Sequence, residues 1–235
     1  MRRNSTEPLI LYEDNHLIIV NKQPGDIVQG DKTGDRPLSD IVKAYVGKRY
    51  QKPGAVFLGV VHRLDRPVSG AVIFARTSKA LTRLNEMLRQ GEIRKTYWAV
   101  VKNRPAAESG HLVHHLVRKE ALNRSFAYDQ PVEGSQRAEL NYRVISQSKS
   151  FFLLEVELLT GRHHQIRAQL SAMNMPIRGD LKYGYPRSNP GGSIHLHARR
   201  LTFIHPVSKI LIDVEAMPPQ EAVWDAFLSI LRQQR

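Results

Sequence analysis

Short apolar runs separated by turn residues dominate the first third of the sequence. They lie at residues 9–12, 17–20, 56–60 and 71–75, and they consist largely of Val, Ile, Leu and Phe. Runs of about four to eight such residues, bounded by Gly, Pro, Asn or Asp, are typical of buried strands. This part of the chain therefore predicts several strands with little solvent exposure.

Apolar residues at helical spacing predict four helices. We expect them at residues 39–46, 77–90, 166–173 and 223–231. Ser39 is the expected N-cap of the first helix, and Thr77 or Ser78 that of the second. Gly47 and Gly91 follow the last expected turns of these two helices, where glycine commonly ends a helix.

The second half of the sequence shows alternation of apolar and polar residues. Residues 138–144 and 152–158 alternate in this way, which predicts paired antiparallel strands with one solvated face. Further strands are expected at residues 94–101, 194–198, 201–204 and 210–214. Because no repeat or Gly/Ser-rich linker divides the chain, we expect one α+β domain in two merged halves around a largely antiparallel sheet.

The charge of the chain indicates a class of partner. The 235 residues include 35 Lys and Arg against 22 Asp and Glu, which gives a formal net charge of +13. Such a charge on a chain that is 41% apolar favours a polyanionic partner, most often nucleic acid. Without cysteine, disulfides and thiolate chemistry are excluded. Since the N-terminal residues lack the apolar core of a signal peptide and no apolar run could span a membrane, we expect a cytoplasmic protein.

Residues 103–136 look less regular than the rest of the sequence. They contain a group of histidines and cations, namely His111, His114, His115, Arg118, Lys119 and Arg124. A metal site is not expected here, because no carboxylate or further histidine stands at ligand spacing. We interpret the segment as a basic, mobile insert that faces RNA.

One acidic residue stands in a stiff loop between two apolar runs. Arg63 and Arg66 flank Asp65, and Pro67 fixes its own φ and favours an extended backbone before it. Gly70 permits a tight turn. A loop held between two strands can present a reactive carboxylate. On its own, an ordinary surface ion pair would explain the same residues.

Two later segments carry complementary chemistry. Tyr97 follows two cations at the start of a predicted strand and, alone, would be an ordinary strand tyrosine. Residues 161–167 bring two arginines, two histidines and a glutamine to the start of a predicted helix. The N-terminus of a helix with such side chains nearby is a natural site for an anion.

Together these segments resemble the RluA-like family of RNA pseudouridine synthases. Residues 62–70 match the family signature H-R-L-D-x-x-T-S-G, with Val68 where Thr is usual. Residues 94–97 match the tyrosine motif, and residues 159–167 match the T-G-R-x-H-Q-I-R motif, with His163 at a position that is usually small and polar. An early Lys-Pro-Gly element at residues 22–25 and a late L-H-A…H-P element at residues 196–206 complete the match.

The resemblance implies a fold and a domain organisation. It implies the α+β pseudouridine synthase fold, with a mixed, mostly antiparallel central sheet in two merged halves, flanking helices and a basic active-site cleft. We expect a short tail at residues 1–8 and a catalytic domain over residues 9–235, without the S4-type RNA-binding domain that many family members carry.

The resemblance also implies isomerisation of uridine to pseudouridine in rRNA or tRNA. Asp65 would attack, or assist cleavage of, the glycosidic bond of a flipped-out uridine, and whether it attacks the ribose or the base stays open. Tyr97 would lie against the uracil and act as the base at C5 or position that base. Arg167 would pair with Asp65 and keep it ionised, with Arg162 as the second choice.

Further residues are expected to contact RNA or the base. The expected RNA contacts are Lys22, Arg63, Arg66, Lys95, Arg162 and His164. Lys22 could equally be a solvated turn lysine. Leu64 and Ile166 would form apolar walls around the base. No cofactor, metal or membrane is expected, and we expect a monomer.

Two other classes of function remain as alternatives. A non-catalytic RNA-binding or ribosome-associated protein would also explain the charge of +13. A metal-dependent nuclease or phosphatase built on the histidines would need clustered carboxylates, which the sequence does not offer.

Overall fold

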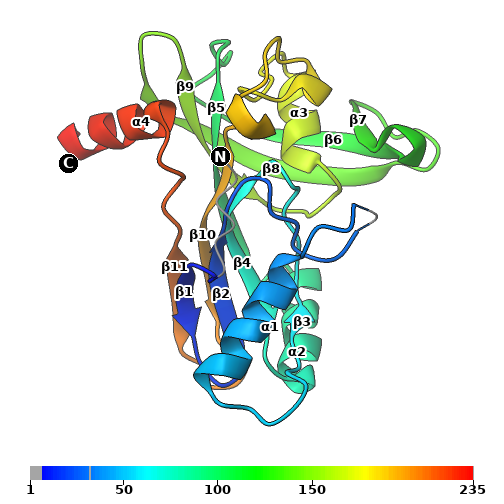
Figure 1. The fold of residues 1–235 in the computed structure, drawn as a ribbon. Coiled ribbons are helices and arrows are strands. Elements are labelled where there is room, and N and C mark those ends of the chain that lie inside the picture. Colours follow the sequence, from blue (N-terminus) through cyan, green and yellow to red (C-terminus); the bar gives the residue numbers. More distant parts are fainter. Residues whose placement is uncertain (1–6, 32, 235) are drawn as a thin grey trace. The chain divides into compact units, whose positions relative to one another are not determined.

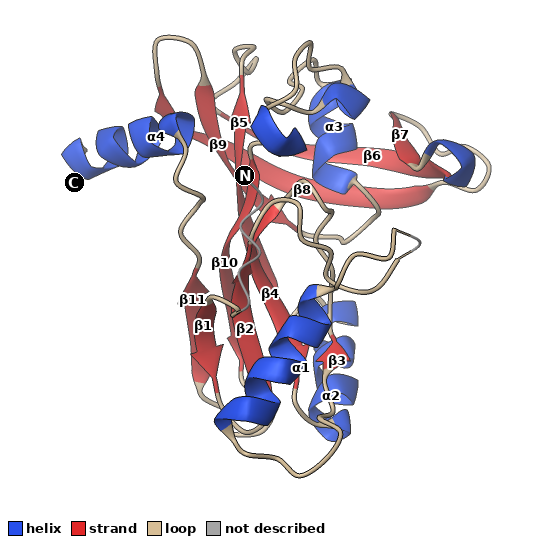
Figure 2. Cartoon of the chain, in the orientation of Figure 1, coloured by secondary structure: helices blue, strands red, loops and turns tan. Residues whose placement is uncertain are grey.

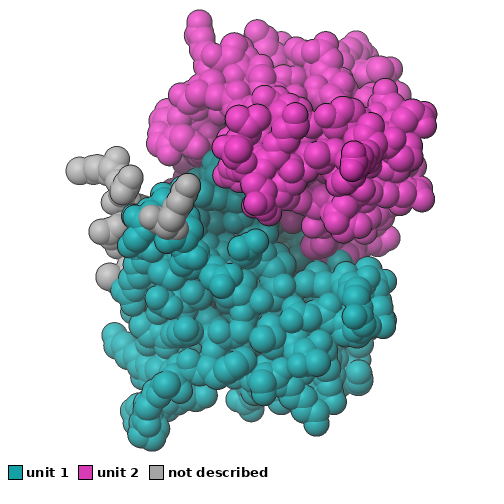
Figure 3. Space-filling model, turned by 90° about the vertical axis from the view of Figure 1, so that its right-hand side faces the viewer, with its two compact units in different colours: residues 1–93, 198–217 teal, residues 94–197, 218–235 magenta. Residues whose placement is uncertain are grey.

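The chain forms two compact units (Figure 1, Figure 3). The structure, a computed structural model, describes residues 7–31 and 33–234. Unit 1 combines residues 1–93 with 198–217, and unit 2 combines residues 94–197 with 218–235. Most of the expected tail, residues 1–6, lies outside the described residues.

Unit 1 is built on antiparallel strands (Figure 2). Its strands are β1 (Ile10–Glu13), β2 (Leu17–Lys22), β3 (Gly59–Val60), β4 (Ser69–Ala75), most of β10 (Leu196–Ile204) and β11 (Leu211–Glu215). They lie in the order β1-β2-β4-β10, with β3 paired to β4 and β11 paired to β10. The unit also holds helices α1 (Leu38–Arg49) and α2 (Ser78–Arg89).

The apolar runs of the sequence form the core of unit 1. Leu17, Ile19 and Ile73 are fully buried, and they pack with Ala80 and Leu84 from one side of α2. Burying aliphatic side chains of this size contributes about 1.5–3 kcal/mol each. The apolar residues whose spacing predicted these strands and α2 are therefore the residues that pack them together.

Unit 2 is a second antiparallel sheet region with two helices. Its strands are β5 (Arg94–Val101), β6 (Ser109–Lys119), β7 (Arg124–Tyr128), β8 (Gln136–Gln147) and β9 (Phe152–Leu158), in the order β5-β9-β8-β6-β7. Its helices are α3 (Gln165–Ala172), α4 (Ala222–Gln233) and the 3-10 turns η1 (Glu120–Leu122), η2 (Leu181–Tyr183) and η3 (Pro190–Gly192).

Strand register determines which residues of unit 2 share a face. Tyr97 pairs with Val156, which pairs with Tyr142 on β8. Ala138 lies four residues before Tyr142, so it points to the same side. Since Ala138 packs with Ala168 of α3, Tyr97 lies on the face of the sheet that α3 covers.

The opposite face of unit 2 belongs to α4. Trp98, next to Tyr97, packs with Val100 and Leu153 against Trp224 and Phe227. The terminal helix predicted from its apolar spacing is thus confirmed. It covers the side of the sheet that faces away from α3.

Helix α1 differs from its prediction at both ends. It begins after Pro37, whose extended backbone forms the N-cap, and Ser39 lies inside the helix. It also continues through Gly47 to Arg49. Glycine inside a helix costs only about 1 kcal/mol, and the two cations that follow suit the negative end of the helix. For α2 the prediction is confirmed, because the Thr77 hydroxyl accepts a hydrogen bond from the Ala80 amide.

Three further predictions about the secondary structure were also wrong. Residues 109–119 and 124–128 form the hairpin of β6 and β7 rather than an irregular insert, because His114 is buried and takes an apolar position in the alternation. The expected strand at residues 56–60 shrinks to Gly59–Val60. Residues 196–204 form one strand. Arg199 and Arg200 do not interrupt this strand, because they pair with acidic residues on the neighbouring strand β11.

The α+β class and the mostly antiparallel pairing are confirmed. Within the described ranges, no helix has the length and apolar character needed to cross a bilayer.

Candidate functional site

The loop that carries Asp65 is fixed by its own backbone. The amide of Val68 donates to the carbonyl oxygen of Asp65 at 3.0 Å, which closes a turn around Arg66 and Pro67. The amide of Gly25 donates to the carbonyl oxygen of Arg66 at 2.8 Å. Leu64 and Val68 are buried on either side of Asp65. The carboxylate therefore stands on a loop with little freedom.

Gly70 allows the end of this loop to enter the sheet. Its φ is +119°, and a Cβ at this position would lie 2.4 Å from the carbonyl oxygen of Ala198. No other residue type fits such a close backbone approach. Val68, which departs from the family signature, is only 2% exposed, so an apolar side chain suits its surroundings.

Lys22 lies at the end of β2, opposite Gly70. Its side chain is fully buried, and its Nζ donates to the carbonyl oxygens of Gln23, Arg66 and Val68 at 3.0, 3.1 and 2.6 Å. Because all of its donors are used inside unit 1, the expectation that Lys22 contacts RNA is wrong. Lys22 instead supports the loop of Asp65.

The buried ammonium of Lys22 has an altered pKa. Burial lowers the pKa of Lys22 to about 7. The nearby Arg66 also lowers this pKa, whereas the carboxylates of Asp26 and Asp65 raise it and offset part of the effect of burial. The positive charge of Lys22 thus contributes to the field at Asp65 at the cost of desolvation.

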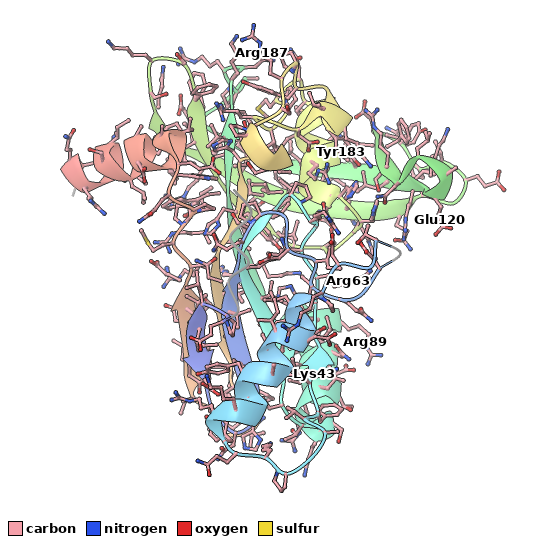
Figure 4. The ribbon with its side chains drawn as sticks, viewed as in Figure 1. Lys43, Arg63, Arg89, Glu120, Tyr183 and Arg187 are labelled. Atoms are coloured by element: carbon pink, nitrogen blue, oxygen red, sulfur yellow. The ribbon has the colours of Figure 1, made fainter. Side chains whose placement is uncertain are left out.

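The two arginines beside Asp65 differ in their contacts. Arg63 is exposed (Figure 4). Arg66 is half-buried, and its Nη2 lies 2.7 Å from Asp35 Oδ2 and 2.8 Å from Thr33 Oγ1. An RNA contact by Arg66 would therefore compete with these partners. For both arginines the RNA contact stays a prediction.

In unit 2, Lys95 and Tyr97 share the face covered by α3. Tyr97 is buried in the middle of β5. Lys95 lies two residues earlier on the same strand. If Gly161 carried a Cβ atom, that atom would lie 3.6 Å from Lys95 Nζ. Burial lowers the pKa of Lys95. The start of β5 and the T-G-R-x-H-Q-I-R motif are therefore close neighbours within this unit.

Gln165 holds the loop of that motif in place. Its Oε1 accepts hydrogen bonds from the Thr160 hydroxyl at 2.8 Å and from the Arg162 amide at 3.0 Å. Its Nε2 donates to the carbonyl oxygen of Glu139 at 3.0 Å. The glutamine of the motif is thus a buried support that ties the loop to β8.

Arg167 forms a bidentate ion pair with Asp180. Its Nε lies 2.7 Å from Asp180 Oδ2 and its Nη2 lies 2.9 Å from Asp180 Oδ1, and both side chains are buried. The guanidinium also lies over the ring of Tyr183, 4.9 Å from its centroid. This geometry fixes the plane of Arg167, and its Nη1 lies outside the pair with Asp180.

The remaining predicted residues of unit 2 lie around α3. His164 caps the helix in a left-handed conformation, and its Nδ1 is 2.9 Å from Tyr183 Oη. Ile166 is buried, and Arg162 is exposed with its Nε bonded to the carbonyl oxygen of Arg137 at 3.1 Å. The contacts of Arg162 and His164 with RNA, and of Ile166 with the base, stay predictions.

The predicted residues divide between the two units. Unit 1 holds Lys22, Arg63, Leu64, Asp65 and Arg66. Unit 2 holds Lys95, Tyr97, Arg162, His164, Ile166 and Arg167. Their joint action in one active site, including the pairing of Arg167 with Asp65, stays a prediction.

Sequence reasoning missed the supports of Arg167. Gly179 and Asp180 follow the motif as a turn, but the sequence indicated Asp65 as the partner of Arg167 and gave no sign of the pair with Asp180. Tyr183 gave no signal at all, because a tyrosine in a short 3-10 turn is ordinary. Both are revealed only by tertiary contacts.

The net charge of +13 favours a nucleic-acid partner, but it does not distinguish an enzyme from a binding protein. Comparison with known proteins makes the distinction. Residues 16–172 match the family model described as RNA pseudouridylate synthase, and the chain belongs to this family. The resemblance and the enzyme class predicted from the motifs are thereby confirmed.

Individual relatives cover nearly the whole chain. One from Synechocystis sp., described as an uncharacterized RNA pseudouridine synthase, is 35% identical over 95% of this chain and 69% of its own length. Ribosomal large subunit pseudouridine synthase C of Vibrio cholerae is 31% identical over 97% of this chain and 70% of its own length. The structure of human RNA pseudouridylate synthase domain containing 4 has a TM-score of 0.78 at 23% identity and covers 95% of this chain and 93% of its own, which supports the fold.

Proposed function

We propose that this chain isomerises specific uridines to pseudouridine in structured rRNA or tRNA, with Asp65 as the catalytic carboxylate. The observation that carries the proposal is the clamped loop of Asp65, whose neighbouring carbonyl oxygens are held by Lys22 and Gly25. A surface ion pair needs no such support, whereas a reacting carboxylate must be positioned within a fraction of an ångström.

The chemistry assigns a distinct task to each residue. The N1–C1′ bond of uridine breaks, the uracil turns within the pocket and a C5–C1′ bond forms, while a proton leaves C5 and another is gained at N1. Asp65 attacks the ribose or the base, or assists cleavage of the glycosidic bond, and it must be deprotonated to do so. Any bond that its carboxylate forms to the nucleoside breaks again before pseudouridine is released, so the free carboxylate is regenerated. Arg167 acts as its cationic partner, and Tyr97 lies against the uracil as the base at C5 or as its positioning group.

The target uridine has to leave its stack before it can react. Five polar residues would contact the RNA backbone or fill the space that the uridine leaves: Arg63, Arg66, Lys95, Arg162 and His164. Two apolar residues, Leu64 and Ile166, would pack on the base. RNA is recognised largely through shape and turned-out bases, which short motifs do not encode.

Relatives indicate the two classes of RNA to test. The relative from Vibrio cholerae is titled a ribosomal large subunit enzyme, and one from Pectobacterium carotovorum is titled tRNA pseudouridine synthase C. The expected cytoplasmic location and monomeric state stay predictions.

Asp65→Asn tests the proposal directly. Pseudouridines would be mapped position by position in rRNA and tRNA from cells that lack the gene, complemented with wild type, Asp65→Asn or Asp40→Asn. Asp40 is an exposed acid on α1 that pairs with Lys43, so its variant is a matched control. We expect wild type and Asp40→Asn to restore the same sites and Asp65→Asn to restore none. Restoration by Asp65→Asn would refute the assignment.

A binding measurement separates this proposal from the non-catalytic alternative. Purified Asp65→Asn is expected to bind unmodified transcripts as tightly as the wild type, while only the wild type produces pseudouridine in them. If wild type binds these transcripts and leaves every uridine unchanged, the non-catalytic RNA-binding protein becomes the better description.

A further inference from the structure

Arg124 is the first residue of β7, and its guanidinium lies against two aromatic rings. Its guanidinium carbon lies 5.0 Å from the ring centroid of Phe126 and 5.1 Å from that of Tyr183. Its Nε is buried without a hydrogen-bond acceptor, and among residues 7–31 and 33–234 no carboxylate forms an ion pair with it. A buried N–H without an acceptor lacks the hydrogen bond that normally offsets its desolvation.

The neighbours of Arg124 fix its position. The Asn123 side-chain oxygen lies 3.2 Å from His163 Nε2, and the Ser125 amide donates to Tyr183 Oη at 2.8 Å. The Ser125 hydroxyl also donates to the carbonyl oxygen of His163 at 2.7 Å. The residues before and after Arg124 are thus tied to the motif that begins α3, so the guanidinium is presented by a rigid frame.

The ring of Tyr183 is in contact with two guanidinium groups, and these differ in their ion pairs. Arg167 lies 4.9 Å from the ring centroid, and its charge is balanced by the bidentate pair with Asp180. Arg124 lies 5.1 Å from the same centroid, and none of the acids in the described part of the chain forms an ion pair with it. This part of unit 2 therefore carries an excess positive charge that a bound anion would neutralise.

Two lysines extend the excess charge. Lys119 Nζ lies 5.2 Å from the Phe126 centroid, and Lys182 Nζ donates to the carbonyl oxygen of Asn123 at 2.9 Å. Both are exposed, and neither forms an ion pair within the part of the chain that the structure describes. The adjacent Arg118 differs, because its Nη2 lies 3.8 Å from Glu120.

We propose that Arg124, together with Lys119 and Lys182, binds a phosphate group of the substrate RNA at this edge of unit 2. A guanidinium presents several donors in one plane, which matches the oxygens of a phosphate, and the two lysines add charge without demanding a fixed geometry. The proposal rests on the proposed function, since it names a contact with the same RNA. It assigns a binding role to the segment that the sequence suggested only as a basic insert.

The test measures how RNA binding depends on salt. Wild type, Arg124→Gln and Arg124→Lys would be titrated with unmodified transcripts of large-subunit rRNA and of tRNA over a series of KCl concentrations. RNA binding weakens as salt rises, and each phosphate contact adds about −0.7 to −0.9 to the slope of log K against log[salt]. We expect Arg124→Gln to reduce the slope by nearly this amount and to weaken binding about tenfold at moderate salt, and Arg124→Lys to restore most of the slope.

A matched control separates this effect from loss of charge in general. Arg143→Gln removes an exposed arginine on β8 of the same unit, where Glu155 lies 2.7 Å from its Nη2, and it should leave the slope unchanged. Lys119→Gln/Lys182→Gln is a second variant that leaves Arg124 itself unchanged. If circular dichroism shows that Arg124→Gln is unfolded, this double variant decides the question through the same loss of slope.

The outcomes also separate this inference from the proposed function. Unchanged slopes in both Arg124→Gln and the double variant would overturn the phosphate site, even if pseudouridine is formed. A reduced slope without any pseudouridine in the wild-type reaction would support the phosphate site and refute the proposed activity.

Discussion

The two units fix their chemical groups by different means. In unit 1, Asp65 stands on a loop whose backbone carbonyl oxygens are held by one buried ammonium, that of Lys22. In unit 2, Arg167 is held by side chains, through the carboxylate of Asp180 and the ring of Tyr183. Because the first support is a buried amine that releases its proton near neutral pH and the second is a bidentate ion pair, the two should respond differently to mutation and to pH.

Asp180→Asn is expected to cause the largest loss of stability. It removes the charge that balances Arg167 and leaves a buried guanidinium without its counterion, which typically costs about 3–5 kcal/mol. Pseudouridine formation should fall as well, because the plane of Arg167 is no longer fixed. Urea unfolding and a single-turnover assay would measure the two effects.

Asp213→Asn is the matched control for this prediction. Asp213 pairs with Arg200 between β10 and β11, but both side chains are substantially exposed. Exposed pairs contribute about 0–1 kcal/mol. If Asp180→Asn destabilises the protein no more than Asp213→Asn does, the pair of Arg167 and Asp180 is not the support described here.

Lys22→Met should change how stability depends on pH. The pKa of Lys22 is about 7 in the folded protein, against 10.5 as its ordinary value. Between these values the unfolded chain holds a proton that the folded chain has released, so stability contributed by this group rises with pH. The unfolding free energy of wild type relative to Lys22→Met should therefore increase by up to about 1.4 kcal/mol per pH unit between pH 7 and 9.

Urea unfolding followed by far-ultraviolet circular dichroism at several pH values would measure this difference. Lys43→Met serves as the control, because Lys43 is an exposed lysine on α1 with one weak ion pair, and its profile should run parallel to that of wild type. Parallel profiles for Lys22→Met would show that Lys22 keeps an ordinary pKa and is not the desolvated support of the loop.

The sequence predicted the chemistry of unit 1 better than its supports. The loop of Asp65 was recognisable because its arginines, Pro67 and Gly70 are contiguous and their backbone preferences are local. The role of Lys22 was not, since burial depends on the pairing of β2 with β4 and on a turn more than forty residues away. A lysine next to a turn looks solvated until tertiary structure covers it.

In unit 2 the same limit appears at the hairpin of β6 and β7. His114 occupies a buried position, so the period of two was hidden by a residue that is usually partly exposed. The unusual His163 was visible as a departure from the family motif, but its contacts with Asn123 and Ser125 were not. Side-chain networks between distant segments leave no periodic trace in a sequence.

Tyr183→Phe should give the smallest of these effects. The variant keeps the ring that lies against Arg124 and Arg167. It removes the hydroxyl, which accepts the Ser125 amide at 2.8 Å and lies 2.9 Å from His164 Nδ1. Leaving one buried amide without its acceptor costs about 1–3 kcal/mol, and we expect the lower half of this range because the edge strand can admit water. Hydrogen exchange should show faster exchange of the Ser125 amide, with β5 and β9 unaffected.

Tyr128→Phe is the control variant, because Tyr128 lies on β7 together with Ser125. Tyr128 is 37% exposed, so loss of its hydroxyl should change neither stability nor exchange at Ser125. Equal effects of the two variants would mean that the Tyr183 hydroxyl does not anchor β7 to the motif of Arg167. The residues beside Arg124 would then lose one of the three hydrogen bonds described above, and the two with His163 would remain.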